Sequence, residues 1–334
     1  MHCCFIDLDQ IKMERDEVVE RCPKMAWYKK LICYMQGIEI PLFLYFLSLG
    51  ILLPAQNHFL YSRTCLYIFN STEICSKIDK DPALGEEESQ LQQTFSYYST
   101  IQMVFLYLPS TVTTLMMGWW CDLFSLKYPL LFPHFGSAIG TILFTVYYFM
   151  EPTLTSPMIL SLPSLIYGVT GASSTEIMAA FAYVTKSSGL KNRTVRVAVV
   201  ESCIGLGMTF GHLISAVALG RDNTFLAFIL QVCFSLYACL YVASMVPELH
   251  DAQLKQIANT ETGGSIFKLI FFPSRKILAG LKIVVRKWND SPFAITERLV
   301  LFFMIPLTTC FFVTSGISAI LFSYVKKRPL SMTS

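Results

Sequence analysis

Seven long apolar runs divide the sequence, and polar or charged segments separate them. Each run has the roughly 20 residues that an α-helix needs to cross the hydrocarbon core of a bilayer. We therefore predict an all-α, multi-pass membrane protein. The predicted transmembrane helices lie at 38–60, 95–117, 129–150, 158–184, 195–219, 225–246 and 299–322.

The charges of the connecting segments predict how these helices are oriented. Residues 61–94 are polar and acidic, whereas residues 247–298 are long and basic. Lysine and arginine accumulate on the cytoplasmic side of membrane proteins, so we expect the N-terminus in the cytoplasm. This orientation leaves few basic residues outside before the C-terminal tail, namely Arg63, Lys77, Lys80 and Arg221.

The same topology predicts the organisation of the chain. A cytoplasmic segment at 1–37 precedes a six-helix bundle at 38–246, and a cytoplasmic loop at 247–298 leads to the seventh helix at 299–322. The tail at 323–334 is then extracytoplasmic, although it is basic. An odd number of helices that ends in a basic outward tail suggests a chain that stops within a larger design.

Two features of the first predicted outer loop fit an extracytoplasmic location. Asn70 begins an Asn-Ser-Thr sequon there, which predicts N-glycosylation. Cys65 and Cys75 share this loop. The sequence leaves open whether they form a disulfide or stay as two free thiols.

Composition agrees with a membrane protein and argues against other classes. Of the 334 residues, 54% are hydrophobic and 15% are charged, which is far from the balance of a soluble domain. The net charge of +3 is small and scattered, so no nucleic-acid surface is expected. The 11 cysteines show no CxxC pair and no ligand-like spacing with histidine, so we predict no metal and no cofactor. The sequence contains no GxSxG, HExxH or P-loop motif, which argues against an enzyme.

The segment MMGWWCDLFSLKYPLLF, after the second predicted helix, contains a partial signature. Gly118, Asp122 and Lys127 match the pattern G-x-x-x-D-R-x-G-R-R/K, whereas its first arginine, second glycine and second arginine are absent. The segment resembles the signature of major facilitator transporters, in which two six-helix halves surround a midplane site. The resemblance implies a latch at the cytoplasmic mouth that holds the halves in one of two states. A helix-capping Asp122 and a solvated Lys127 are the alternative.

Three further stretches are more specific. They are IEIPLFLYFLSLGILLPAQNHFLYSRTC at 38–65, FAYVTKSSGLKNRTVRVAVVESCIGLGM at 181–208 and YVKKRPLS at 324–331. Together they resemble solute carrier family 46, the group that includes the proton-coupled folate transporter. The resemblance implies a secondary transporter of a small organic solute, anionic and folate-like, that moves with protons. It also implies a plasma-membrane or lysosomal location.

The second of these stretches carries Glu201 within a predicted helix. The resemblance implies that Glu201 couples transport to protons, and a carboxylate that faces a cavity of low dielectric can bind and release a proton as access alternates. The alternative is an ion pair of Glu201 with Arg193 or Arg196. The chain has Lys186 and Ala319 where acidic residues are common in this family, which weakens folate itself as the predicted solute.

Other polar residues in the predicted helices are candidates for the same site. Glu176 and His212 are expected to act as proton or solute partners, with a packing hydrogen bond as the alternative for His212. Arg193 and Arg196 are candidate anion contacts, or they only enforce topology.

The run GLGMTFG at 205–211 has the look of a nucleotide-binding loop, but it lies inside a predicted helix and follows no strand. Small residues four positions apart let two helix backbones approach each other. Gly207 and Gly211 therefore predict close packing of this helix against a neighbour.

A secondary transporter of a small organic anion and protons is the function that the sequence favours. Its expected partners are the solute, protons and the lipid bilayer. A seven-helix receptor fits the helix count, but such receptors place the N-terminus outside, which opposes the charge pattern. A non-transporting fragment that regulates a partner half is the other alternative.

Overall fold

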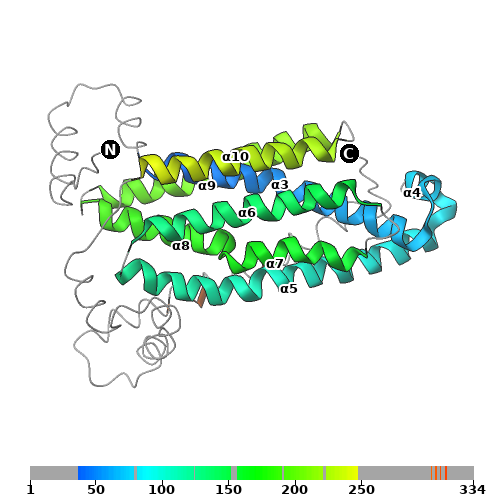
Figure 1. Cartoon of the computed structure of the whole chain (residues 1–334), viewed down its shortest axis with the longest axis horizontal. Coiled ribbons are helices and arrows are strands. Elements are labelled where there is room, and N and C mark those ends of the chain that lie inside the picture. The colour runs from blue at the N-terminus through cyan, green and yellow to red at the C-terminus, as the bar shows by residue number, and fades with distance from the viewer. Residues whose placement is uncertain are drawn as a thin grey trace, which may run out of the picture.

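A computed structural model describes residues 37–78, 81–123, 125–151, 156–189, 192–220 and 223–246, together with single positions between 302 and 313. Within these ranges the chain is helical and has no β-strand, so the predicted all-α fold is confirmed. The long helices run side by side along one axis (Figure 1). The predicted segments 1–37 (apart from Gly37), 247–298 and 323–334 lie outside the described residues, as does most of the predicted helix at 299–322.

Five of the described helices are long and apolar enough to cross a membrane, by length and composition. They are α3 (Glu39–Phe69), α5 (Gly85–Leu123), α6 (Lys127–Phe149), α9 (Arg193–Leu219) and α10 (Thr224–Met245). Each contains nearly all of one predicted span. Helices α3 and α5, with 31 and 39 residues, exceed the roughly 20 residues that a bilayer requires, because their polar ends continue as helix beyond the apolar run.

The prediction of one continuous helix at 158–184 is wrong, because this segment is broken. It forms a 3-10 turn, η2 (Pro157–Leu160), and two helices, α7 (Ser161–Val169) and α8 (Ala172–Ser187), which lie end to end along the bundle (Figure 1). At the break, Gly171 and Ala172 adopt positive φ angles of 93° and 46°. A Cβ atom added to Gly171 would also lie 2.6 Å from Cβ of Thr175. Glycine is therefore required here for both backbone and space.

One end of the bundle, called the α4 end, carries the short elements α4 (Thr72–Lys77) and η1 (Pro82–Leu84). The Ser71 side chain caps α4 by accepting a hydrogen bond from the backbone N–H of Ile74. A disulfide joins Cys65 near the end of α3 to Cys75 in α4. Asn70 is exposed and ends α3 in a left-handed conformation, φ 48°. The predicted sequon is therefore accessible at this end.

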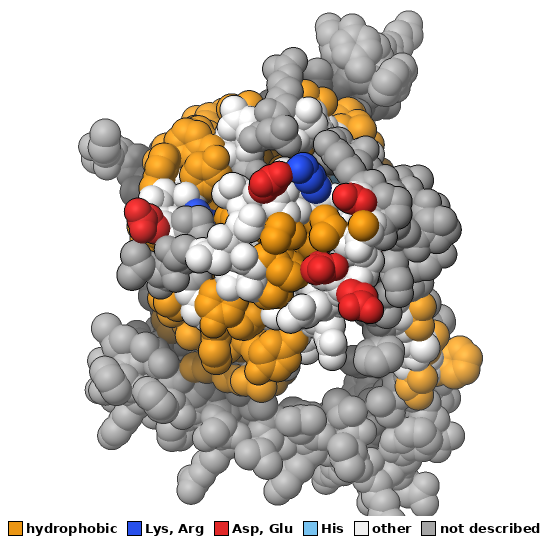
Figure 2. All heavy atoms as spheres, turned by 90° about the vertical axis from the view of Figure 1, so that its right-hand side faces the viewer, with side chains coloured by type: hydrophobic (Ala, Val, Ile, Leu, Met, Phe, Trp, Pro, Cys, Tyr) orange, Lys and Arg blue, Asp and Glu red, His pale blue; other side chains and the backbone are white. Residues whose placement is uncertain are grey.

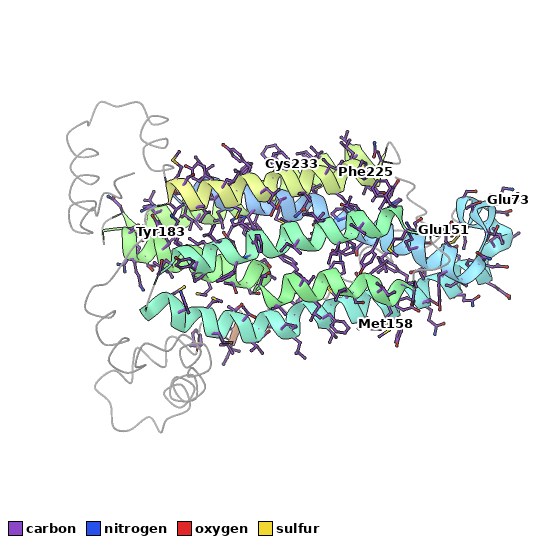
Figure 3. All side chains as sticks on the ribbon, viewed as in Figure 1. Glu73, Glu151, Met158, Tyr183, Phe225 and Cys233 are labelled. Carbon is purple, nitrogen blue, oxygen red and sulfur yellow. A yellow bond between two sulfur atoms is a disulfide. The ribbon has the colours of Figure 1, made fainter. Side chains whose placement is uncertain are left out.

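The two ends of the bundle differ in character. Acidic side chains gather on the α4 end between apolar flanks (Figure 2). Glu73 lies at this end, whereas Tyr183 lies near the opposite end (Figure 3), which we call the Tyr183 end. The flanks expose large apolar side chains, with Leu108, Phe149 and Leu240 each about two thirds exposed at 66%, 69% and 68%. Such a surface suits contact with lipid rather than with water.

Glycines allow α3 and α9 to cross in close contact. A Cβ atom added to Gly207 would lie 2.6 Å from the carbonyl oxygen of Phe43, and one added to Gly211 would lie 2.8 Å from Cα of Gly50. Side chains do not approach a neighbouring backbone so closely. The crossing therefore depends on small residues, as is usual in membrane helix pairs.

Candidate functional site

The broken helix is held in place by hydroxyl groups from α5. Ser110 Oγ donates to the carbonyl oxygen of Gly171, and Thr113 Oγ1 donates to that of Val169, both at 2.9 Å. The hydroxyls of Thr114 and Thr175 also share a hydrogen bond of 2.8 Å. Irregular backbone inside a membrane is tolerated where neighbouring helices satisfy its polar groups. The hydroxyl groups of α5 bond the carbonyl groups at the break, so the break is stabilised by the neighbouring helix.

Glu176 lies one turn after the break, and its side chain is completely buried. His134 on α6 is equally buried, and its Nε2 lies 3.4 Å from Glu176 Oε1. Their geometry does not meet that of a hydrogen bond. Among the described residues, both carboxyl oxygens and both ring nitrogens lack a hydrogen-bond partner. The two groups are close enough to exchange a proton after a small movement, but neither is satisfied as it stands.

A lone charge is expensive in such a setting, because burial removes the water that would solvate it. The Glu176–His134 pair has no net charge when it holds one titratable proton. This proton lies either on Glu176, which leaves both groups uncharged, or on His134, which gives a carboxylate next to an imidazolium. Binding a second proton makes the pair cationic, and losing the first makes it anionic. Protonation therefore changes the net charge of the bundle interior at this point.

Two tyrosines complete what we call the polar core, defined as Tyr45, His134, Tyr167 and Glu176. The hydroxyls of Tyr45 on α3 and Tyr167 on α7 are hydrogen-bonded to each other. The ring of Tyr45 packs edge to face against the imidazole of His134, with centroids 4.9 Å apart. Helices α3, α6, α7 and α8 thus each contribute one member.

Helix α10 supports the polar core from outside. Ser235 Oγ donates to the backbone carbonyl of His134 at 2.8 Å, and Gln231 Nε2 donates to Ser137 Oγ at 2.7 Å. These bonds fix α6 and therefore the imidazole. Within the described part of the chain, no group of three His, Cys, Asp or Glu side chains is placed to hold a metal ion.

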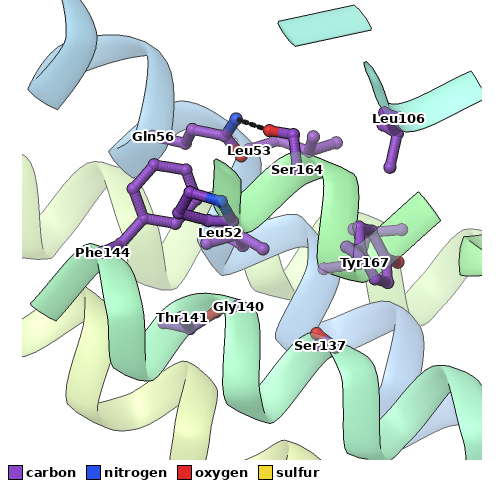
Figure 4. A pocket seen from close by; sticks show the side chains of 12 residues that line it. Leu52, Leu53, Gln56, Leu106, Ser137, Gly140, Thr141, Phe144, Ser164 and Tyr167 are labelled. Atoms are coloured by element: carbon purple, nitrogen blue, oxygen red, sulfur yellow. Dashed lines mark hydrogen bonds between the residues drawn. The ribbon is translucent and has the colours of Figure 1, made fainter. Parts of the chain in front are cut away.

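A small pocket adjoins the polar core (Figure 4). The side chain of Tyr167 lines it, so this residue belongs to both. Gln56 Nε2 lies 3.0 Å from Gln102 Oε1 and 3.4 Å from Ser164 Oγ. The residues that line the pocket are all uncharged. They are Leu49, Leu52, Leu53, Gln56, Leu106, Ser137, Gly140, Thr141, Phe144, Pro163, Ser164 and Tyr167.

Arg196 is engaged in a second buried cluster. Its Nη2 lies 3.0 Å from Oε1 of Glu39, and its Nη1 donates to the hydroxyls of Ser187 and Ser188. The other Glu39 oxygen accepts a hydrogen bond of 3.2 Å from the backbone N–H of Gly37. Arg196 therefore ties α9 to α3 and α8. This arrangement does not favour Arg196 as an anion contact, and its carboxylate partner is Glu39 rather than Glu201.

The other predicted proton groups lie elsewhere. Glu201 is exposed on α9, and so is His212. His212 Nδ1 is 2.6 Å from the carbonyl oxygen of Met208, which belongs to the same helix. The predicted hydrogen bond of His212 to a neighbouring helix is therefore not the one observed. Of the three predicted proton groups, Glu176 is the one enclosed by the bundle.

The predicted signature lies at the end of α5 and the start of α6. Gly118 has open space beside its Cα, and the backbone N–H of Lys127 donates to Ser125 Oγ at 3.2 Å. The side chain of Asp122 lies outside the described residues, so the latch stays a prediction. Arg193, the other candidate anion contact, is partly buried, and its Nε has no hydrogen-bond partner among the described residues.

Sequence reasoning missed His134, Tyr45 and Tyr167. His134 lies inside the apolar run 129–150, and the criterion that selected His212, an ionisable group within a span, would have selected it too. The tyrosines carry no such signal, because an aromatic residue in a predicted membrane helix is usual. Their pairing depends on which faces of α3 and α7 meet, which one sequence does not specify.

In a comparison with protein families, the model of the Major Facilitator Superfamily matches residues 42–334. This range includes the polar core and, apart from the first three residues of α3, the described helices.

Proposed function

Because the chain belongs to the major facilitator superfamily, a family of membrane transporters, we propose that it moves a small organic solute across a membrane together with protons, and that Glu176 holds the coupled proton. The superfamily match supports transport in general. The choice of Glu176 is carried by one observation, its complete burial at 3.4 Å from His134 without a hydrogen-bond partner among the described residues.

The burial of Glu176 supports this role because a transporter must switch between two states of similar energy. A buried group whose charge changes with protonation alters the cost of burial and so biases such an equilibrium. The broken helix next to Glu176 has the form that transporters use at their sites. Movement at Gly171 would change the distance between α8 and His134.

The solute class rests on the resemblance to solute carrier family 46, which suggests a small organic anion. A proton that travels with an anion offsets its charge, which lowers the cost of moving the anion through the membrane. The predicted cytoplasmic N-terminus and glycosylation at Asn70 belong to the same proposal. They are supported by the distribution of charge and by the exposure of Asn70.

Glu201, an exposed residue of the same type, is a matched control for Glu176. The test uses the full chain in liposomes, with radiolabelled folate and a panel of small organic anions as probes. Uptake by the wild type should rise as the outer pH is lowered, because more protons are available to bind Glu176. Glu176→Gln should remove the dependence on acid, whereas Glu201→Gln should keep it.

A second measurement does not need the solute. Infrared difference spectroscopy after a drop in pH detects the C=O stretch of a carboxylic acid as it forms, and Glu176→Gln should remove the corresponding buried band. If the band and the acid dependence both persist in Glu176→Gln and vanish in Glu201→Gln, the proton group is Glu201 and our assignment is wrong.

A further inference from the structure

The pocket and the polar core meet at one side chain. Tyr167 lines the pocket (Figure 4). Its hydroxyl is hydrogen-bonded to that of Tyr45, whose ring contacts His134. The imidazole of His134 in turn lies 3.4 Å from the Glu176 carboxyl. A series of polar groups therefore leads from the pocket towards the buried pair, and its last gap, from the Tyr45 hydroxyl to the pair, is not closed by a hydrogen bond among the described residues.

The pocket is suited to water. Its cavity of about 20 Å³ exceeds the roughly 10 to 15 Å³ that one water molecule requires, and such a molecule needs two to four polar partners. Gln56, Ser137, Ser164 and Tyr167 offer polar atoms in the lining. Thr141 also lines the pocket, and its buried Oγ1 has no hydrogen-bond partner among the described residues. An orphaned hydroxyl of this kind is usually satisfied by buried water.

We propose that this pocket binds water and that the Tyr167–Tyr45 hydroxyl pair carries protons from it to the Glu176–His134 pair. The inference rests on the proposed function, since it supplies the route to the group named there. A protonated water in the pocket gives a proton to the oxygen of Tyr167. The O–H proton of Tyr167 passes to Tyr45, and the O–H proton of Tyr45 passes to the Glu176 carboxylate when a small movement brings the two groups within hydrogen-bond distance. Both hydroxyls end neutral, the water is neutral, and Glu176 has gained one proton.

The surroundings leave few other routes. Besides the polar core itself, the titratable groups that act on it are Tyr107 on α5 and Cys239 on α10. His134 Nε2 lies 3.4 Å from Glu176 Oε1, and Glu176 also acts electrostatically on Tyr45, Tyr167 and Cys239. The nearest buried ion pair, Glu39–Arg196, is closed by its own hydrogen bonds. The tyrosine pair is thus the polar connection between the pocket and the carboxyl group.

The test measures the rate at which Glu176 is protonated separately from the fraction of Glu176 that is protonated at the end. In the full chain in liposomes, time-resolved infrared spectroscopy after a pH jump follows the protonation of Glu176. Tyr167→Phe and Tyr45→Phe should slow it at least about tenfold, equal to about 1.4 kcal/mol of barrier, with the final amplitude unchanged. Tyr148→Phe is the matched control, because Tyr148 stacks on Phe225 away from the polar core, and its rate should equal that of the wild type.

Thr141→Val tests the water site with a side chain of the same shape. It should slow protonation severalfold while leaving the Tyr167–Tyr45 bond intact. A tyrosine pair that only holds α3 against α7 would instead lower thermal stability in both Phe variants and leave the rate as in Tyr148→Phe, which would overturn the route. In that case Glu176→Gln still abolishes the infrared band if the proposed function holds, so the two failures are distinguishable.

Discussion

Among the described residues, the side chains of two glutamates, Glu39 and Glu176, are completely buried, but their hydrogen bonding differs. Glu39 is bound by the Arg196 guanidinium at 3.0 Å and by the Gly37 backbone N–H. Glu176 has a histidine at 3.4 Å and no hydrogen-bond partner among the described residues. Burial alone therefore does not distinguish the two carboxylates, whereas their hydrogen bonds do.

The helices next to the two carboxylates also differ in how they are held in place. Glu39 and Arg196 lie on α3 and α9, the pair that glycines bring into close contact. Glu176 follows a helix break that is held by hydroxyl groups from α5. One region is thus fixed by tight packing and charge, and the other by single hydrogen bonds of modest strength. We expect the α3–α9 region to behave as a rigid unit and the break as the part that moves.

The same substitution at the two carboxylates should give the largest difference. Glu39→Gln leaves the Arg196 guanidinium buried without a counter-ion, so the free energy of unfolding should fall by about 3 to 5 kcal/mol. Glu176→Gln replaces a carboxyl group that makes no hydrogen bond among the described residues, so the change should stay below about 1 kcal/mol. Thermal unfolding of both variants in detergent measures this. Equal losses would show that Glu176 is as structural as Glu39.

The packing of α3 on α9 can be tested with two glycines of one helix. A Cβ atom at Gly211 would lie 2.8 Å from Cα of Gly50, whereas one at Gly205 would meet nothing within 4 Å. Gly211→Ala should therefore cost about 1 to 3 kcal/mol through overpacking. Gly205→Ala should be neutral or stabilise by up to about 1 kcal/mol, because alanine favours helix. A stable Gly211→Ala protein would argue that this crossing is loose.

The sequence predicted the five long helices but not the break between α7 and α8. Long apolar runs gave the helices α3, α5, α6, α9 and α10, because crossing a bilayer requires length and hydropathy that any sequence must display. The run 158–184 hid the break at Gly171, since the run as a whole is apolar enough for a span and hydropathy carries no information on φ. Glycine is also frequent in intact membrane helices.

The site was predicted only in part for a related reason. Glu176 stood out as an ionisable group in a span, but its partner His134 lies 42 positions earlier in the chain, a separation that no local pattern bridges. The pairing of Arg196 with Glu39 was missed in the same way, because the sequence offered Glu201 as a nearer carboxylate. Contacts between helices depend on which faces meet, and one sequence does not specify them.

The smallest expected effect concerns the hydroxyls that hold the break. Ser110→Ala removes the hydrogen bond to the Gly171 carbonyl and should cost about 0.6 kcal/mol, the average for such bonds between membrane helices. Thr111→Ser is the matched control on α5, because the Thr111 hydroxyl bonds the Tyr107 carbonyl of its own helix and the substitution retains that hydroxyl. If the break is the moving part, Ser110→Ala should also speed hydrogen exchange at backbone amides near Gly171 while leaving those at the α3–α9 crossing unchanged. Faster exchange at both places would mean that the bundle opens as one unit and that the two regions do not differ in rigidity.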